Sequence, residues 1–151
     1  SGLNILKYIE TWNEEKWWLK GTEAYLEPET MAALMSATYD GHEGTLGAKA
    51  GIKTADPSMV VVMPGLTDYD FDYIAKMSAW FLANRKDKKW PCDRFNLHHY
   101  SNRGNKPKQH PAQWVMSGGC PPSEDANFDT VKELIAFAKS LGMPVGRFGC
   151  H

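Results

Sequence analysis

Two glutamates and an asparagine stand close together near the amino terminus, in Glu10-Thr11-Trp12-Asn13-Glu14. The apolar run Ile5 to Ile9 precedes them, so we expect them at the carboxyl end of a strand, the end at which (β/α)-barrels carry their active sites. A carboxylic acid beside an aromatic wall keeps its proton more readily, because low polarity disfavours the charged form. The pattern therefore predicts a glutamate beside Trp12, Glu10 or Glu14, as a candidate proton donor, and Asn13 as an amide that can bond a substrate hydroxyl.

The spacing leaves a second interpretation open, because Glu14-Glu15 directly precedes Lys16-Trp17-Trp18. Acidic residues favour the first turn of a helix, where the backbone N–H groups create a positive potential. On this interpretation the two glutamates form an acidic helix cap and have no chemical role.

The segment Asn96-Leu97-His98-His99-Tyr100 is the second candidate for chemistry. We expect a strand over Arg94 to Tyr100, and residues two apart on a strand point to the same side. His98 and Tyr100 would then line one surface together. The alternative is that His98 is an ordinary hydrogen-bonded interior residue.

Strand-like and helix-like segments alternate along the whole chain. We expect strands over Ile5 to Ile9, Ser58 to Met63, Arg94 to Tyr100 and Met143 to Val145. We expect helices from Pro28 to near Tyr39, over Asp70 to Arg85, and over Thr130 to Ser140. Asn127 or Asp129 would cap the last of these helices. The unbroken apolar run Ser58 to Met63 suits a parallel strand covered on both faces. The order βαβαβαβ predicts an α/β fold with parallel strands and right-handed crossovers, and residues 1–151 as a fragment of a (β/α)8 TIM barrel.

Composition excludes several classes of function. Seventeen basic and 18 acidic side chains give a net charge of −1, which argues against a nucleic-acid surface. The basic run Arg85 to Lys89 reads as a solvated helix end. No apolar run approaches the ~20 residues of a membrane span, and no signal peptide is expected. Five histidines and three widely spaced cysteines match no metal or disulfide pattern, so we expect no metal and no cofactor.

The pattern Glu-x-Trp-Asn-Glu at a strand end resembles the fourth-strand motif of clan A glycoside hydrolases, most closely the branch of family 39 β-xylosidases. The resemblance implies that Asn13 is a substrate-binding amide and Glu14 the general acid/base. His98 and Tyr100 match the His-x-Tyr of the sixth strand, which implies that they contact the sugar and orient the nucleophile. The resemblance runs from Leu6 to Val145 and implies strands four to seven of a barrel that cleaves glycosidic bonds in a carbohydrate substrate, commonly outside the cytoplasm.

The expected seventh strand departs from that pattern. Clan members carry the nucleophilic glutamate there, often as Glu-Phe-Gly, whereas Arg147 precedes Phe148-Gly149 here and no glutamate follows Glu133. A retaining mechanism needs two carboxyl groups ~5–5.5 Å apart. We therefore expect this chain alone to be inactive, and the alternative is a non-catalytic carbohydrate-binding or scaffold protein on a degenerate barrel.

Three complete strand–helix units and a fourth strand would also leave the edges of the sheet without partners. Unpaired strand edges with apolar faces promote association. We therefore expect the chain to associate with itself through these open barrel edges.

Overall fold

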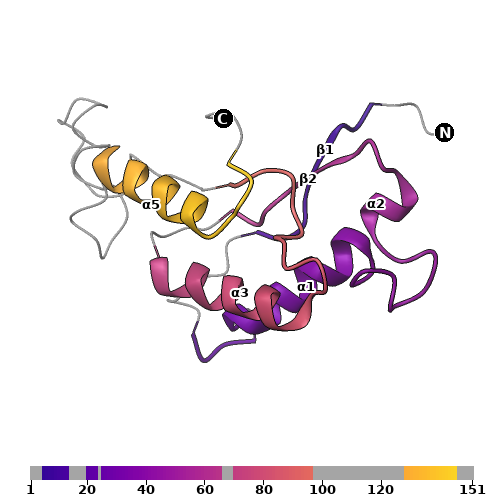
Figure 1. Ribbon diagram of the computed structural model, residues 1–151, viewed down its shortest axis with the longest axis horizontal. Helices are drawn as coiled ribbons and strands as arrows, with labels where there is room; N and C mark the ends of the chain where they lie inside the picture. The colour runs from indigo at the N-terminus through magenta and orange to yellow at the C-terminus, as the bar shows by residue number, and fades with distance from the viewer. Residues whose placement is uncertain (1–4, 14–19, 24, 66–69, 97–127, 146–151) are drawn as a thin grey trace.

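The structure, a computed structural model, describes residues 5–13, 20–23, 25–65, 70–96 and 128–145, and these form a mixed α/β fold (Figure 1). The elements are β1 (Tyr8–Glu10), α1 (Pro28–Asp40), α2 (Ile52–Ala55), β2 (Val60–Val62), α3 (Phe71–Asn84) and α5 (Phe128–Ser140). β1 and β2 form a small parallel sheet, with Tyr8 beside Val60 and Glu10 beside Val62.

Two further segments continue this sheet through backbone hydrogen bonds. The N–H of Met63 donates to the carbonyl of Arg94 at 2.9 Å, and Val62 and Arg94 form a parallel bridge. Beyond that segment, the N–H of Phe95 donates to the carbonyl of Pro144 at 3.1 Å. Each strand-like segment therefore lies beside its successor in the chain, in the order in which the sequence predicted its strands.

The two long helices that cover the sheet begin and end at residues suited to those places. Pro28 opens α1, where its missing N–H costs nothing, and Gly41 closes it in the left-handed conformation (φ 66°). The carboxylate of Asp70 accepts the Tyr73 N–H at 2.9 Å and so caps α3. These boundaries agree with the helices expected from Pro28 to near Tyr39 and over Asp70 to Arg85.

Of the described helices, α1, α3 and α5 pack around one apolar cluster on one side of the sheet. Met63, Phe95 and Met143 reach this cluster from the strand-like segments. The helices contribute Met31, Ala32 and Met35 from α1, Tyr73, Ile74, Met77 and Phe81 from α3, and Leu134 and Ala138 from α5. We call this side of the sheet the helix face and the opposite side the far face.

A close backbone approach fixes the connection from α1 to β2. Gly51 has φ 98°, and a Cβ atom there would lie 2.5 Å from the backbone nitrogen of Gly41. Only glycine fits this crossing, which places the short helix α2 beside the end of α1. The sequence analysis did not predict a helix over Ile52–Ala55.

Three expectations need correction. Helix α5 begins at Phe128, so Asp129 lies inside the helix and is not its cap; Asn127 lies outside the described residues. Arg85 is not part of a solvated helix end, because its side chain is 1% exposed and bonded to two carboxylates. The third and fourth segments make single bridges or bonds within the described residues rather than the full strands expected over Arg94 to Tyr100 and Met143 to Val145.

Candidate functional site

The carboxyl ends of β1 and β2 lie side by side at one rim of the sheet. The register begins with Tyr8 beside Val60, and the parallel bridge between Asn13 and Gly65 keeps the same offset. β1 itself ends at Glu10, and the equal offset shows that neither chain gains a residue over the other between Glu10 and Asn13. The parallel alignment of the two segments thus reaches Asn13.

A hydrogen bond from side chain to backbone joins the two strand ends at this rim. The Oε1 atom of Glu10 accepts the N–H of Gly65 at 2.7 Å. The carboxylate thus takes a backbone donor that lies beyond the last residue of β2. The first glutamate of the motif consequently has a positioning role at the rim, which the sequence did not predict.

Alternation along β1 assigns its side chains to the two faces. Ile9 lies beside the buried Val61, and Met63, two residues after Val61, belongs to the apolar cluster, so Ile9 faces the helix face. Its neighbours on β1, Tyr8 and Glu10, therefore belong to the far face. A groove beside Ala37 and Thr38 of α1 is bordered by Ile9, Glu10 and Thr11 alike. Trp12 is exposed, as a sugar-stacking wall requires.

Asn13 stands just beyond the end of β1, where it forms an isolated parallel bridge with Gly65. Its side chain is exposed. The role of Asn13 as a substrate-binding amide stays a prediction.

The third strand-like segment presents its even-numbered residues to the far face. The bridge between Val62 and Arg94 places Arg94 on the side of Val62 and Glu10, whereas Phe95 is buried in the cluster on the helix face. Asn96 is next in the same alternation. The sequence analysis missed Arg94 and Asn96, although the alternation of polar and apolar residues from Arg94 to His98 signals them.

Glu14, His98 and Tyr100, the main predicted site residues, lie outside the described residues, as does Arg147. Of the predicted site, the structure thus places Trp12 and Asn13. It also gives the pairing of the two segments that lead to the others.

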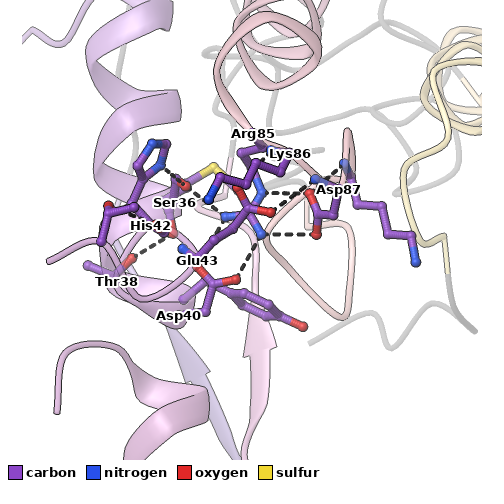
Figure 2. Close-up of polar contacts among 12 residues, drawn as sticks. Ser36, Thr38, Asp40, His42, Glu43, Arg85, Lys86 and Asp87 are labelled. Carbon is purple, nitrogen blue, oxygen red and sulfur yellow. Dashed lines mark hydrogen bonds and ion pairs between the residues drawn. The ribbon is translucent and has the colours of Figure 1, made fainter. Parts of the chain in front are cut away.

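A second polar cluster lies at the other end of the sheet, where α1 and α3 end (Figure 2). The guanidinium of Arg85 donates to both oxygens of Asp40, at 3.1 and 2.8 Å, and to both oxygens of Asp87, at 3.0 and 3.1 Å. It also donates to the hydroxyl of Ser36 at 2.7 Å, and that hydroxyl lies 2.8 Å from Nδ1 of His42. Every donor nitrogen of the guanidinium is thereby used.

The loop after α1 also contacts this cluster, through the side chain of Glu43. The carboxylate of Glu43 accepts the backbone N–H groups of Lys86 and Asp87, at 2.7 and 3.0 Å. His42 and Glu43 take positive φ angles of 50° and 54° to reach these positions. Such backbone conformations persist only where surrounding contacts maintain them.

Charge pairing outweighs burial in this cluster. Burial opposes ionisation of Asp40 and Asp87, yet the hydrogen bonds from Arg85 lower the pKa of both carboxyl groups. Burial also opposes the charge on Arg85, and the bonds to Asp40 and Asp87 raise its pKa. A cation that is saturated in this way is a structural group and leaves no donor for a ligand.

The carboxylate of Asp93 is the centre of a third polar cluster, which joins β2 to α1 and α2. Its carboxylate accepts the Val61 N–H at 2.8 Å and the Tyr39 hydroxyl at 3.1 Å, and it pairs with Lys53 at 2.6 Å. Burial opposes its ionisation, but the bonds from Lys53 and Val61 lower its pKa. Burial and the nearby Asp93 charge raise the pKa of Tyr39 to about 12.

Other chemistries find little support in the part of the chain that is described. Burial raises the pKa of the Cys92 thiol to about 12, so it stays protonated and is not a nucleophile. No three His, Cys, Asp or Glu side chains of those residues gather as metal ligands would. Likewise, none of the helices described has the length and apolar character to cross a bilayer.

Comparison with known protein families, with curated proteins and with solved structures finds no match for this chain. The functional interpretation therefore depends on the residues and on the geometry described above.

Proposed function

We propose that this chain is a segment of a retaining glycoside hydrolase with a (β/α)8-barrel fold, in which Glu14 is the general acid/base. In the parent enzyme Glu14 protonates the leaving oxygen and then activates water for the second step. Trp12 forms the wall beside the sugar, and His98 and Tyr100 contact the sugar. One observation carries the proposal: β1 pairs in parallel with β2 up to Glu10, and the bridge of Asn13 to Gly65 keeps the same offset at the carboxyl end of the strand.

The register supports Glu14 through the alternation of side chains. Glu10 lies on the far face of β1, and Trp12 and Glu14 have the same parity as Glu10. A chain that keeps this alternation as far as Glu14 therefore directs the Glu14 carboxyl to the far face, next to the indole of Trp12. A proton donor beside an aromatic wall is the arrangement that keeps a carboxyl group protonated.

The third segment supports His98 and Tyr100 in the same way. Both share the parity of Arg94, which the bridge to Val62 assigns to the far face. If the segment continues in an extended conformation, the imidazole and the phenol lie on the face that carries Glu10 and Trp12. Three residues far apart in the sequence would then converge on one surface.

The order of the strand-like segments supports a barrel over a doubly wound sheet. In a doubly wound sheet the strand order reverses at a switch point, and helices cover both faces. Here each segment lies beside its successor, and α1, α3 and α5 share one apolar cluster on one face. A parallel sheet wound in one direction with helices on one side is the arrangement that closes into a (β/α)8 barrel.

The experiment that tests the proposal uses the full-length product of the gene that encodes this chain. Its reading frame is expected to contain further strand–helix units and a strand that carries the nucleophilic glutamate. A reading frame that stops at His151 would instead favour a non-catalytic carbohydrate-binding protein. The 151-residue chain alone is expected to hydrolyse no aryl glycoside.

In the full-length enzyme, Glu14→Ala should lower kcat/KM by ~10²–10⁴ for substrates with poor leaving groups, because these depend on protonation. Activated aryl glycosides should lose less in the first step, and the glycosyl-enzyme should then accumulate. Added azide should attack its anomeric carbon, displace the enzyme carboxylate and release a glycosyl azide, a step that needs no proton. Glu15→Ala is the matched control, and equal losses in the two variants, or no azide product, would refute the role of Glu14.

A further inference from the structure

Asp40 and Gly41 form the one Asp-Gly step of the chain, and the sequence contains no Asn-Gly step. In such a step the backbone nitrogen of the glycine can attack the carboxyl carbon of the aspartate, because glycine has no Cβ to hinder the approach. The new C–N bond closes a five-membered succinimide ring, and the proton of the nitrogen leaves with the carboxyl OH as water. Water then opens the ring at either carbonyl. Attack at the main-chain carbonyl gives isoaspartate, whose backbone runs through the side chain and is one CH₂ longer.

Hydrogen bonds occupy both reacting groups of this step in the folded protein (Figure 2). Asp40 is the last residue of α1, and the N–H of Gly41 donates to the carbonyl of Ala37 at 3.0 Å. The two carboxylate oxygens of Asp40 accept N–H groups of Arg85 at 3.1 and 2.8 Å, and one of them also accepts the Glu43 N–H at 2.9 Å. Because one carboxyl oxygen must leave as water, the ring cannot close until its bond to Arg85 is broken.

The same ion pair keeps the aspartate in its less reactive form. A neutral carboxyl group can lose water during ring closure, whereas an ionised carboxylate repels the attacking nitrogen. Burial opposes ionisation of Asp40, but the hydrogen bonds from Arg85 lower the pKa of its carboxyl group. Arg85 is 1% exposed and is also bonded to Asp87. The cation therefore stays beside Asp40 for as long as α1 and α3 remain packed.

We propose that Asp40–Gly41 is a site of succinimide and isoaspartate formation that Arg85 protects while α1 and α3 are packed together. When the two helices separate, the carboxyl group is released and the step becomes reactive. The product does not fit back into the fold. A Cβ atom at Gly41 would already lie 2.8 Å from the carbonyl oxygen of Ala50, so this crossing has no room for a longer backbone. The modification thus makes a transient opening permanent, whatever reaction the protein performs.

Peptide mapping measures the reaction at this one position. Trypsin releases residues 21–49 as a single peptide, in which Asp40 is the only aspartate and no asparagine occurs. Labelling of this peptide by isoaspartate methyltransferase therefore reports Asp40 alone. At neutral pH the folded chain is expected to react at least about tenfold more slowly than the same chain in guanidinium chloride, because charge-assisted bonds must break first. Equal rates in the two conditions would overturn the inference.

A pair of variants separates local protection from global stability. Arg85→Met is expected to raise the rate about tenfold or more. Met77→Ala is the matched control, because it opens a cavity in the same helix packing and leaves the pair of Asp40 and Arg85 in place. The two are compared at guanidinium concentrations that give them the same free energy of unfolding. Equal rates there would show that unfolding alone governs the reaction, and the role of Arg85 would be refuted.

Arg85→Lys keeps the test decisive if Arg85→Met does not fold. Lysine retains the positive charge but lacks the planar fork that contacts both carboxylate oxygens. Its rate of isoaspartate formation is expected to lie between those of the wild type and of the chain in guanidinium chloride. A rate equal to that of the folded wild type would show that the two bonds from Arg85 do not protect Asp40.

Refolding of the modified chain tests the consequence. Chain that contains isoaspartate at position 40 is separated by chromatography, and its tryptophan fluorescence is followed after the denaturant is removed. It is expected not to recover the folded signal, whereas unmodified chain carried through the same steps recovers it. Full recovery by the modified chain would contradict the claim that the modification makes the opening permanent.

Discussion

The two ends of this small sheet differ in how their polar groups are used. Near the amino-terminal ends of the strands, Arg85 is 1% exposed and its guanidinium bonds Ser36, Asp40 and Asp87. At the carboxyl-terminal rim, the described contacts are the bond from Gly65 to Glu10 and the bridge at Asn13, and Trp12 is exposed. One end is closed by ion pairs, whereas the other presents polar and aromatic groups to its surroundings.

This difference follows a general division of labour in β/α folds. The amino-terminal face of a barrel contributes stability, and the carboxyl-terminal face carries the chemistry. Saturated charges fix the ends of α1 and α3 against each other, so that the strands between them have defined positions. In the proposed enzyme, the rim would then present Glu14 without depending on that residue for its own stability.

The largest effect on stability is expected from the buried cation. Arg85→Met removes the partner of two partly buried carboxylates and should lower the free energy of unfolding by about 3–5 kcal/mol, as is typical of broken buried ion pairs. Urea denaturation followed by tryptophan fluorescence measures this change. Arg94→Met is the matched control, because Arg94 is exposed on the far face, and a change of about 0.5 kcal/mol or less is expected there.

Acid should lower the stability that the carboxylates near the amino-terminal ends of the strands contribute. The pKa values of Asp40, Asp87 and Asp93 are lowered in the folded protein, so these groups stabilise it above their ordinary value of about 3.9. That contribution is lost as the pH falls below about 4 and through the lowered folded values. Urea midpoints measured across this range should decline, and more gently in Arg85→Met. A wild-type midpoint that does not change with acid would contradict the ion-pair assignment.

A smaller effect is expected from Asp93, whose surroundings are more open to solvent. Asp93→Ala removes the acceptor for Val61, Tyr39 and Lys53 and should cost about 1–3 kcal/mol of unfolding free energy. Asp72→Ala breaks an exposed pair with Lys76 and should cost less than about 1 kcal/mol. Equal losses of unfolding free energy in the two variants would show that the bonds of Asp93 contribute no more than an exposed ion pair.

The smallest effect is expected at the rim. Glu10→Ala removes the acceptor of the Gly65 N–H and should cost about 1 kcal/mol, whereas Glu10→Gln keeps an oxygen acceptor and should cost less. Amide hydrogen exchange at Gly65 measures the local effect, which should be faster in Glu10→Ala than in Glu10→Gln. Exchange that is the same in both variants would show that Glu10 does not join the strand ends.

Local patterns in the sequence were enough to predict the helices that begin at Pro28 and Asp70 and the parallel pairing of the strand before Glu10 with the run that ends at Met63. The burial of Arg85 could not be predicted, because its main partner, Asp40, is distant in the sequence and the basic run around it resembles a solvated surface. Helix α2 was missed because its four residues have no periodic pattern, and the crossing of Gly41 and Gly51 sets its position.

Part of the candidate site was readable from residue spacing. The spacing predicts that Glu10, Trp12 and Glu14 share one side of a regular strand, and the observed register extends that regularity to Asn13. The spacing did not reveal that Glu10 bonds Gly65, because this contact needs the neighbouring strand end.

A crystal structure of the 151-residue chain would test most directly whether the far face carries the candidate site. We predict that the Glu14 carboxyl lies on the face opposite α1, beside the Trp12 indole, with His98 and Tyr100 on the same face. A Glu14 side chain in the first turn of an ordinary helix, directed into solvent and remote from His98 and Tyr100, would contradict the proposal.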